Sequence, residues 1–345
     1  MALDRFLRRA GVSRRGFLRA GALGLVGSGL AAVGRAVAGE ERSGTASTGA
    51  SGATGESYRA GGAAAPTTRG GLDPHHFLTA FDGGRVSTLP DGRTLREYEI
   101  VAEDREIEVA RGVYFPAWTY NGTVPGPTLR ATEGDLVRVR FRNEGAMPHT
   151  IHFHGFHAAE MDGVFEIVDR GKQFVYEFTA DPFGLHLYHC HVMPLKAHIH
   201  RGLYGTFLID PKTPRPPMRE MVMVMNGYDT DMDGENEFYT VNGVANAYVE
   251  RPIPLRVGEQ VRVYLVNVTE FDLINSLHIH ANFFHLYRTG TSLTPTEFTD
   301  TVMLCQGERA ILEFAYQRPG KFMFHAHQSE FAELGWMGFF EVTEA

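Results

Sequence analysis

The sequence has few cysteines, no excess of positive charge and only one long apolar run. Two cysteines, Cys190 and Cys305, occur in 345 residues, so a disulfide framework does not organise the fold. The formal net charge of -8 argues against a nucleic-acid partner. The apolar fraction of 43% and the charged fraction of 21% are typical of a soluble globular protein, and the length allows two domains.

The one long apolar run follows a pair of arginines. Arg14 and Arg15 stand directly before the Gly/Ala-rich stretch 20–33, and residues 36–38 form a small-residue cleavage site. The stretch is short and weakly hydrophobic for a membrane span, which needs ~20 apolar residues. We therefore expect residues 1–38 to be a cleaved twin-arginine signal peptide, a periplasmic or extracellular location, and no membrane span in the mature form.

A polar segment separates this leader from the rest of the chain. Residues 39–72 are mainly Gly, Ala, Ser and Thr, which offer too little apolar surface to offset the entropy of ordering. We expect residues 39–92 to form a disordered, low-complexity tail and the lead-in to the first domain.

From residue 93 onward the sequence has the pattern of a β protein. Short alternating segments are broken by Gly, Pro and Asn, and no long stretch has the period of a helix. The segment 134–143, in which apolar residues alternate with arginine, recurs as 258–267, and each copy follows an Asn-Gly turn and precedes a His-x-His pair. We therefore predict a duplicated, all-β chain with domains at 93–212 and 213–345, each a β-sandwich or barrel.

Four His-x-His pairs are the clearest chemical feature. Residues i and i+2 of a strand project from one face, so each pair presents two imidazoles to one metal-binding surface. Eight imidazoles from four strands can hold three metal ions and leave positions open for a small molecule. Imidazole suits copper, zinc, iron or nickel, so the pairs alone do not choose the metal. The pairs are His152/His154, His189/His191, His278/His280 and His325/His327.

Cys190 indicates which metal is bound. It lies between His189 and His191, so strand alternation directs its sulfur to the opposite face, into its own domain. His149 and His198 are its natural partners there. Two imidazoles and one thiolate form an electron-transfer copper site, and the backbone of the cysteine links that site to the flanking imidazoles. The plainer interpretation, a buried free cysteine, leaves the flanking histidines unexplained.

These residues resemble the multicopper oxidases, specifically the small two-domain laccase-like branch. The resemblance implies two cupredoxin-like Greek-key domains in tandem, about four copper ions per chain, and a homotrimer whose trinuclear clusters form between subunits. It rests on N-G-T-V-P-G-P at 121–127, E-G-D at 133–135, H-x-x-H-x-H-G at 149–155, Y-H-C-H at 188–191 and H-A-H at 325–327. It makes the type 1 ligands His149, Cys190 and His198, the type 2 ligands His152 and His278, and the type 3 ligands His154, His189, His191, His280, His325 and His327.

The chain departs from the family pattern around the type 1 site. His198 lies eight residues after Cys190 rather than five, a spacing similar to that of copper nitrite reductases. Leu203 stands where a weak axial methionine is usual, so we expect a three-coordinate copper with an apolar axial neighbour; Met193 is the alternative axial residue. In domain two the type 1 positions hold Asn275, Ala326 and Phe331, which implies one thiolate site per chain.

Two carboxylates match acidic residues that lie near the copper cluster in the family. Asp162 matches one beside the type 2 copper and Glu330 one beside the type 3 pair; because reduction of dioxygen to water consumes protons, we expect both to relay them. The simpler interpretation is that Asp162 serves a turn and that Glu330 is a solvated charge. We expect Cys305 to be a buried thiol. The remaining histidines, expected at the surface or behind the ligands, are His75, His76, His157, His186, His200 and His285.

Three functions fit these residues. The leading one is a laccase-like oxidase, in which a small reducing substrate such as a phenol gives single electrons to the type 1 copper and the trinuclear cluster reduces dioxygen. A copper nitrite reductase fits the His198 spacing and the trimer, but it has no use for all four His-x-His pairs. An exported copper-buffering protein would rely on flexible Met-rich or His-rich tracts, which this sequence does not have. The donor, whether a phenol, a metal ion or a protein, is left open.

Overall fold

A computed structural model describes residues 73–344. The expected signal peptide, 1–38, and the expected tail, 39–72, lie outside the described residues and stay predictions. Within the described part, no helix is long and apolar enough to cross a membrane.

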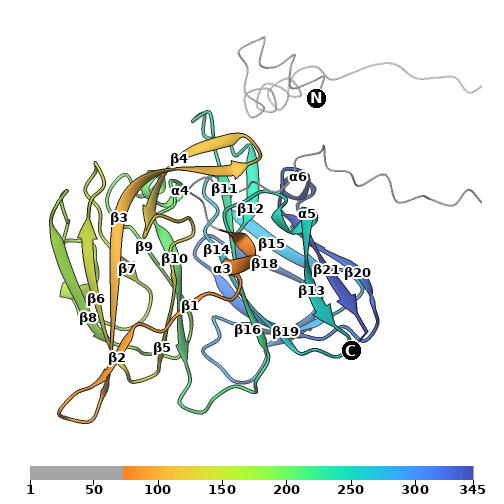
Figure 1. Ribbon diagram of the computed structural model, residues 1–345, viewed down its shortest axis with the longest axis horizontal. Coiled ribbons are helices and arrows are strands. Elements are labelled where there is room, and N and C mark those ends of the chain that lie inside the picture. Colours follow the sequence, from red (N-terminus) through yellow and green to blue (C-terminus); the bar gives the residue numbers. More distant parts are fainter. Residues whose placement is uncertain (1–72, 345) are drawn as a thin grey trace, which may run out of the picture. The chain divides into compact units, whose positions relative to one another are not determined.

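The first domain consists of two sheets (Figure 1). One has the strand order β1-β5-β10-β9-β7, and the other has the order β2-β3-β6-β8, with β4 paired to β3. Two short helical segments, η1 (Ala159–Met161) and α4 (Leu195–His200), follow β7 and β9. The strands are β1 (Phe81–Asp82), β2 (Arg85–Thr88), β3 (Thr94–Ala110), β4 (Val113–Tyr120), β5 (Thr128–Thr132), β6 (Leu136–Asn143), β7 (His152–Phe153), β8 (Gln173–Thr179), β9 (Gly184–His189) and β10 (Tyr204–Asp210).

Strand β6 shows why these residues form a sandwich. Val137, Val139 and Phe141 are fully buried, while the alternate arginines lie on the outer face, as the alternation predicted. The two sheets enclose a core of mostly aromatic and branched side chains, to which Cys190 and Leu203 belong.

The second domain repeats this plan with two sheets of order β12-β11-β14-β19-β16-β17 and β13-β21-β20-β15-β18. The helices of this domain are α5 (Ala247–Glu250) and α6 (Ser329–Glu333). The strands are β11 (Arg219–Tyr228), β12 (Phe238–Val241), β13 (Arg251–Arg256), β14 (Val261–Asn267), β15 (Ile274–Ile279), β16 (Phe284–Arg288), β17 (Glu297–Thr299), β18 (Thr301–Cys305), β19 (Arg309–Phe314), β20 (Gly320–His325) and β21 (Met337–Thr343).

The duplicated sequence segments occupy equivalent places. β6 pairs in parallel with β3 and antiparallel with β8, and β14 pairs in the same way with β11 and β19. The preceding turns match as well: Asn121 and Asn242 both have a φ of 56°, in the left-handed region that asparagine tolerates, and both are followed by a glycine with positive φ. The predicted all-β fold of two tandem cupredoxin-like sandwiches is therefore confirmed.

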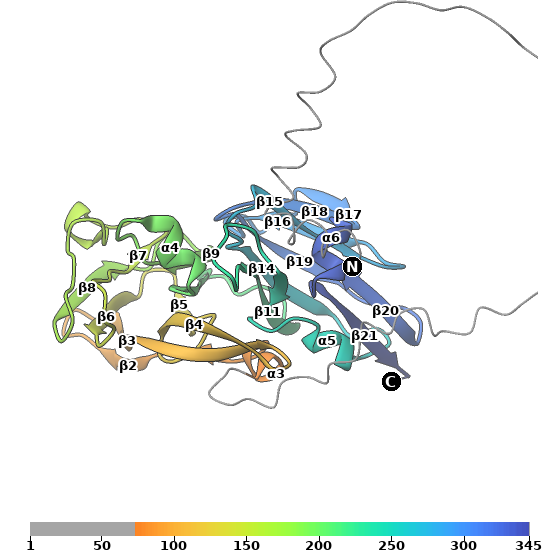
Figure 2. The ribbon, with the colours of Figure 1, turned by 90° about the horizontal axis from the view of Figure 1, so that it is seen from above.

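A third apolar core joins the two sandwiches. The long β3–β4 hairpin extends from the first sandwich toward the second (Figures 1 and 2). Its side chains Ile107, Val109 and Phe115 share a buried cluster with Val222 and Val224 of β11. Because this shared core is apolar and continuous, the two domains pack as a fixed pair rather than as independent modules.

The expectation that the low-complexity tail and lead-in extend to residue 92 is wrong for residues 73–92, which form a helix and two strands that belong to the fold. Helix α3 (Pro74–Phe77) packs on the second domain, where Tyr248 donates a hydrogen bond to the carbonyl of Pro74 at 2.9 Å. The chain then crosses to the first domain, where β1 pairs with β5 and β2 pairs with β3. Phe77 and Leu78 are buried, so this segment adds to the contact between the domains.

Candidate metal centre

The predicted type 1 residues come together in the first sandwich. Cys190 follows β9, His198 lies in α4, and His149 is bridged to Val168. The Nδ1 atoms of His149 and His198 are 3.2 Å apart, and the sulfur of Cys190 lies 3.3 Å from the Nδ1 of His198 and 4.0 Å from that of His149. All three side chains are almost completely buried.

This trio has the protonation state and the shape that a soft metal ion needs. Burial, with the charge of His198, lowers the pKa of His149 to about 3, so its imidazole is neutral. Burial also raises the pKa of the Cys190 thiol, and a bound metal ion would displace that proton. Two neutral imidazoles and one sulfur that converge in an apolar core fit a copper ion in a trigonal site.

The two axial candidates differ in burial. Leu203 is fully buried in the same core as Cys190, and its carbonyl accepts the Cys190 N–H at 3.0 Å. Met193 is 77% exposed, so its thioether faces solvent. The geometry favours Leu203 as the apolar neighbour of the copper site.

Four of the predicted cluster ligands form a half-site on the opposite face of β9. His152 on β7 is paired in register with His189 on β9. The Nε2 atoms of His154 and His189 face each other at 3.3 Å, and the ring of His191 is 5.5 Å from that of His152. Burial lowers the pKa of His154 to about 3 and that of His189 to about 4, so neither ring is protonated near neutral pH.

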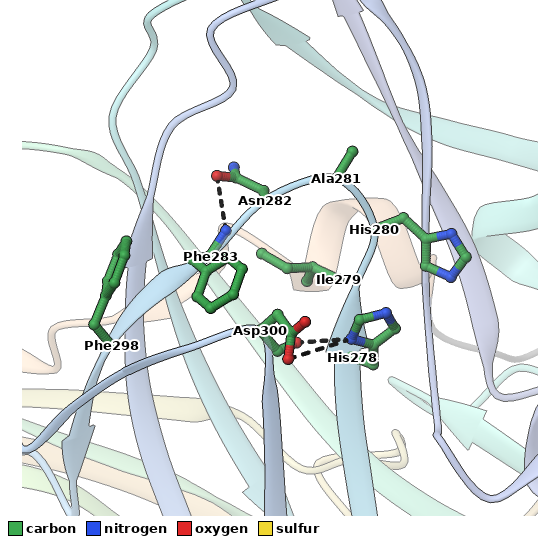
Figure 3. Close-up of a pocket in the computed structure, with 8 residues that line it drawn as sticks. All are labelled: His278, Ile279, His280, Ala281, Asn282, Phe283, Phe298 and Asp300. Atoms are coloured by element: carbon green, nitrogen blue, oxygen red, sulfur yellow. Dashed lines mark hydrogen bonds and ion pairs between the residues drawn. The ribbon is translucent and has the colours of Figure 1, made fainter.

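The second domain holds an equivalent half-site. His278 on β15 is paired in register with His325 on β20, which repeats the His152–His189 pair. The Nε2 atoms of His280 and His325 are 3.0 Å apart, and the ring of His327 lies 5.5 Å from that of His278. Figure 3 shows His278 and His280 at one side of a pocket that also contains Phe283 and Phe298.

Hydrogen bonds orient the imidazoles for metal binding. In each half-site two of the four histidines donate the Nδ1 proton to a backbone carbonyl, which fixes their tautomer and leaves the Nε2 lone pair for a metal. The Nε2 atoms of His189 and His325 are therefore acceptors, and each faces the Nε2 of a second histidine at about 3 Å, a separation that a proton or a shared metal ion can bridge. The Nδ1 contacts run from His152 to Asp162 at 2.8 Å, from His189 to Cys190 at 2.9 Å, from His278 to Asp300 at 2.9 Å and from His325 to Ala326 at 2.6 Å.

The two half-sites do not meet within one chain. Within residues 73–344, the clusters whose potential ligand atoms lie within 4.8 Å of one another draw their histidines from one domain only. Ring contacts among the eight histidines also stay inside each domain across the described part of the chain. A single chain therefore offers two incomplete sites.

Of the two predicted carboxylates, Asp162 is placed beside a histidine half-site by a contact distance. An oxygen of Asp162 lies 3.2 Å from Nδ1 of His152 and 3.7 Å from Nε2 of His157, so this residue stands beside the first half-site. Glu330 lies in the first turn of α6, and its relation to the cluster stays a prediction.

Two further residues lie beside the half-sites. His157, one of the histidines expected at the surface or behind the ligands, forms a cluster with the ligand His152 and with Asp162. The extended pattern H-x-H-x-x-H is its signal in the sequence. Asp300 is the counterpart of Asp162, because its carbonyl also accepts from the Nδ1 of a cluster histidine and its carboxylate lies 4.0 Å from that atom. The sequence pattern does not single out Asp300, which is recognised only when the two domains are compared in the structure.

The type 1 positions of the second domain are filled by ordinary packing. The ring of Phe331 stacks on Tyr239 with centroids 3.8 Å apart, and Ala326 is buried. Asn275 donates to the hydroxyl of Thr269 at 3.0 Å. These side chains offer no thiolate or imidazole to a metal ion.

One expectation about the cysteines is wrong. Cys305 is exposed rather than buried. It ends β18, in which Val302 and Leu304 face the core, so alternation places Cys305 on the outer face with Met303. Among the other histidines, His186 and His200 are buried and bound to backbone groups, and the ring of His285 packs on Phe298.

Tandem β-sandwiches with a buried Cys-His-His trio and two paired-histidine half-sites define a copper protein with cupredoxin-like domains. Comparison with known proteins agrees. Two family profiles, both described as multicopper oxidase, match residues 102–214 and 214–345. The chain belongs to the multicopper oxidase family.

Three known proteins show which copper enzymes the chain is similar to. A crystal structure of a multicopper oxidase is 59% identical, with a TM-score of 0.78, over 79% of this chain and 97% of that one. A copper nitrite reductase from Nitrosomonas europaea is 28% identical, with a TM-score of 0.65, over 72% of this chain and 94% of its own. A copper-containing nitrite reductase of Neisseria meningitidis serogroup A is 29% identical over 245 residues, which span 65% of this chain but only 63% of that relative.

Proposed function

We propose that the protein is a laccase-like oxidase, which takes single electrons from a small reducing substrate such as a phenol and reduces dioxygen to water. One observation carries the proposal: a buried Cys-His-His trio and a paired-histidine half-site lie on opposite faces of the short segment from His189, at the end of β9, to His191. Copper, when bound, supplies one-electron chemistry at both places. The protein's own contribution is the short covalent connection through Cys190, between His189 and His191.

We propose further that the protein is a homotrimer whose clusters, with about four copper ions per chain, form between subunits. Support comes from the separation of the two half-sites in one chain. Beside the second half-site, Phe283 and Phe298 are 48% and 64% exposed, with rings 5.3 Å apart (Figure 3). Beside the first, Phe156 is 68% exposed. Exposed aromatic groups next to incomplete metal sites are what a subunit interface would cover.

Mixed trimers test the proposed assembly. One variant carries His152→Ala with His154→Ala, and the other carries His278→Ala with His280→Ala. Each alone should be inactive, whereas co-expressed chains should recover about a quarter of the activity, because random mixing leaves one intact interface in each mixed trimer. If the mixture stays inactive while both variants form trimers, the clusters are not built between subunits.

Asp162 is proposed to move protons at the first half-site, and Glu330 at the second. Asp162 lies 3.2 Å from a histidine whose Nδ1 already donates to its backbone, so its carboxylate is held beside the cluster ligands. His157, at 3.7 Å, is positioned to orient the same carboxylate. A carboxylate so placed can take up and release protons next to the cluster ligands.

Copper-containing nitrite reductase is the second candidate. It is favoured by the relatives and by the eight-residue spacing from Cys190 to His198. It leaves several of the eight cluster histidines without a role. Copper analysis combined with oxygen and nitrite assays separates the candidates: about four ions per chain with phenol-driven oxygen uptake supports the oxidase. Nitrite reduction by fully metallated protein that consumes no oxygen would overturn it.

We propose that the protein acts in the periplasm or outside the cell after twin-arginine export. Support comes from Arg14 and Arg15 before the apolar stretch. Fractionation of cells that express the full chain should find the protein outside the cytoplasm, and Arg14→Lys with Arg15→Lys should retain it inside. Export that is unchanged in this variant would contradict the proposal.

A further inference from the structure

The short helix α4 carries the type 1 ligand His198. It has six residues and no side-chain hydrogen bond at its N-terminal cap. A helix of this length is not stable by itself in water, so its position depends on the groups that it packs against. The position of His198 depends on the same groups.

His200, on the same helix, is bound by the second domain. Its side chain is 5% exposed, and its Nε2 accepts the backbone N–H of Asp229 at 2.9 Å. Its ring meets Phe271 edge to face at 4.7 Å and, on another side, Phe115 at 5.5 Å. Because a backbone N–H can only donate, this Nε2 is the acceptor nitrogen of the ring.

Phe271 is held in an unusual backbone conformation. Its φ is +70°, a region that bulky side chains rarely adopt and that persists only where the surroundings enforce it. Its ring contacts two side chains of α4: the ammonium of Lys196 lies over the ring, 3.9 Å from the centroid, and the ring of His200 packs against it at 4.7 Å. The second domain therefore presents a strained loop to the helix that bears a metal ligand.

We propose that His200 and Phe271 are positioning residues for the type 1 site, through which the second domain fixes the geometry of the first domain's copper ligand His198. The second domain has no thiolate site of its own, yet it holds the helix on which the remaining site depends. The inference rests on the proposed use of the Cys190 trio as copper ligands and holds whether the acceptor is dioxygen or nitrite.

Substitutions at His200 test this proposal. His200→Leu removes the acceptor for the Asp229 N–H, whereas His200→Gln keeps an acceptor on a side chain of similar reach. We expect His200→Leu to weaken type 1 copper binding about 10- to 100-fold, measured by competition with a chelator, and to alter the blue absorption and the copper hyperfine splitting. His200→Gln should restore most of both signals.

A matched control and a second variant keep the test decisive. His75→Leu also removes one histidine bond to a backbone group and one ring contact, with Tyr248, but it lies on α3, away from the copper site; its type 1 signals should not change. If His200→Leu does not fold, Phe271→Leu, which keeps an apolar side chain but loses the ring contacts, replaces it. Folded variants with wild-type copper affinity and spectrum would overturn the inference. Absence of a type 1 spectrum in the unmodified protein would instead refute the proposed function.

Discussion

The two sandwiches differ at the position directly after an equivalent strand and in the helix that follows it. Both keep a register-paired histidine couple, His152 with His189 and His278 with His325. Directly after the second histidine of each couple, the first domain has Cys190 and the second has Ala326. The face that points to the cluster carries histidines in both copies, whereas the face that points into the domain carries a sulfur ligand in one copy and an apolar side chain in the other. A metal face and a core face of the same segment can therefore vary separately.

The half-sites also differ in exposure. In the first domain His154 and His191 are half-buried, whereas their counterparts His280 and His327 in the second domain are exposed, and His280 lies at the edge of a pocket. The first half-site is thus better shielded by its own sandwich. The second depends on another surface to exclude water, which is consistent with the proposed subunit interface.

The largest effect is expected from Cys190, and its counterpart Ala326 in the second domain should show none. Cys190→Ser should abolish the blue absorption and donor-driven oxygen uptake, because the hydroxyl is a poor ligand for copper, while copper of the cluster stays bound. Ala326→Ser at the counterpart position should leave both signals in place. Optical spectra, copper analysis and oxygen uptake of the two variants check this; equal effects of the two changes would contradict the assignment.

Removal of the side chain that fills the second domain's type 1 position should affect stability rather than chemistry. Phe331 is 7% exposed and stacked on Tyr239. Phe331→Ala should lower the free energy of unfolding by about 3–5 kcal/mol through cavity formation. Urea unfolding measures the loss, and the blue absorption of the folded variant serves as the control. A changed type 1 spectrum would show that this position acts on the metal.

The equivalent aspartates of the two domains, Asp162 and Asp300, should differ in how strongly their loss lowers oxygen uptake. Asp162→Asn should lower oxygen uptake about 10- to 100-fold, because a carboxylate 3.2 Å from a cluster ligand both orients the ligand and exchanges protons. Asp300→Asn should cost less, because that carboxylate is 4.0 Å away. Steady-state rates at matched copper content test the order. Wild-type rates for Asp162→Asn would remove it from the mechanism.

The smallest expected effect concerns the axial neighbour. Leu203→Met should lower the type 1 reduction potential, by ~59 mV if the one-electron equilibrium changes tenfold. Met193→Leu should leave the potential unchanged, since that side chain is 77% exposed. Redox titration of the blue absorption compares them. A larger shift in Met193→Leu would reverse the axial assignment.

Local patterns predicted much of this architecture. Alternation in β6, the duplicated segment and the His-x-His spacing indicated the strands, the tandem fold and the opposite orientation of Cys190, because each depends only on the period of a strand. Cys305 was placed wrongly, since an apolar segment does not say which residues of a strand face the core. The helix anchor at His200 and the role of Asp300 depend on contacts between distant segments, which no local pattern records.

The number of donor molecules oxidised per dioxygen consumed tests the central claim most directly. Copper-loaded protein, given a one-electron phenolic donor in a closed cell, should oxidise about four donor molecules for each dioxygen and release no hydrogen peroxide, because the proposed cluster completes the reduction to water. A ratio near two with peroxide release, or no oxygen uptake at all, would contradict the proposal that the paired histidines of the two domains form one oxygen-reducing centre.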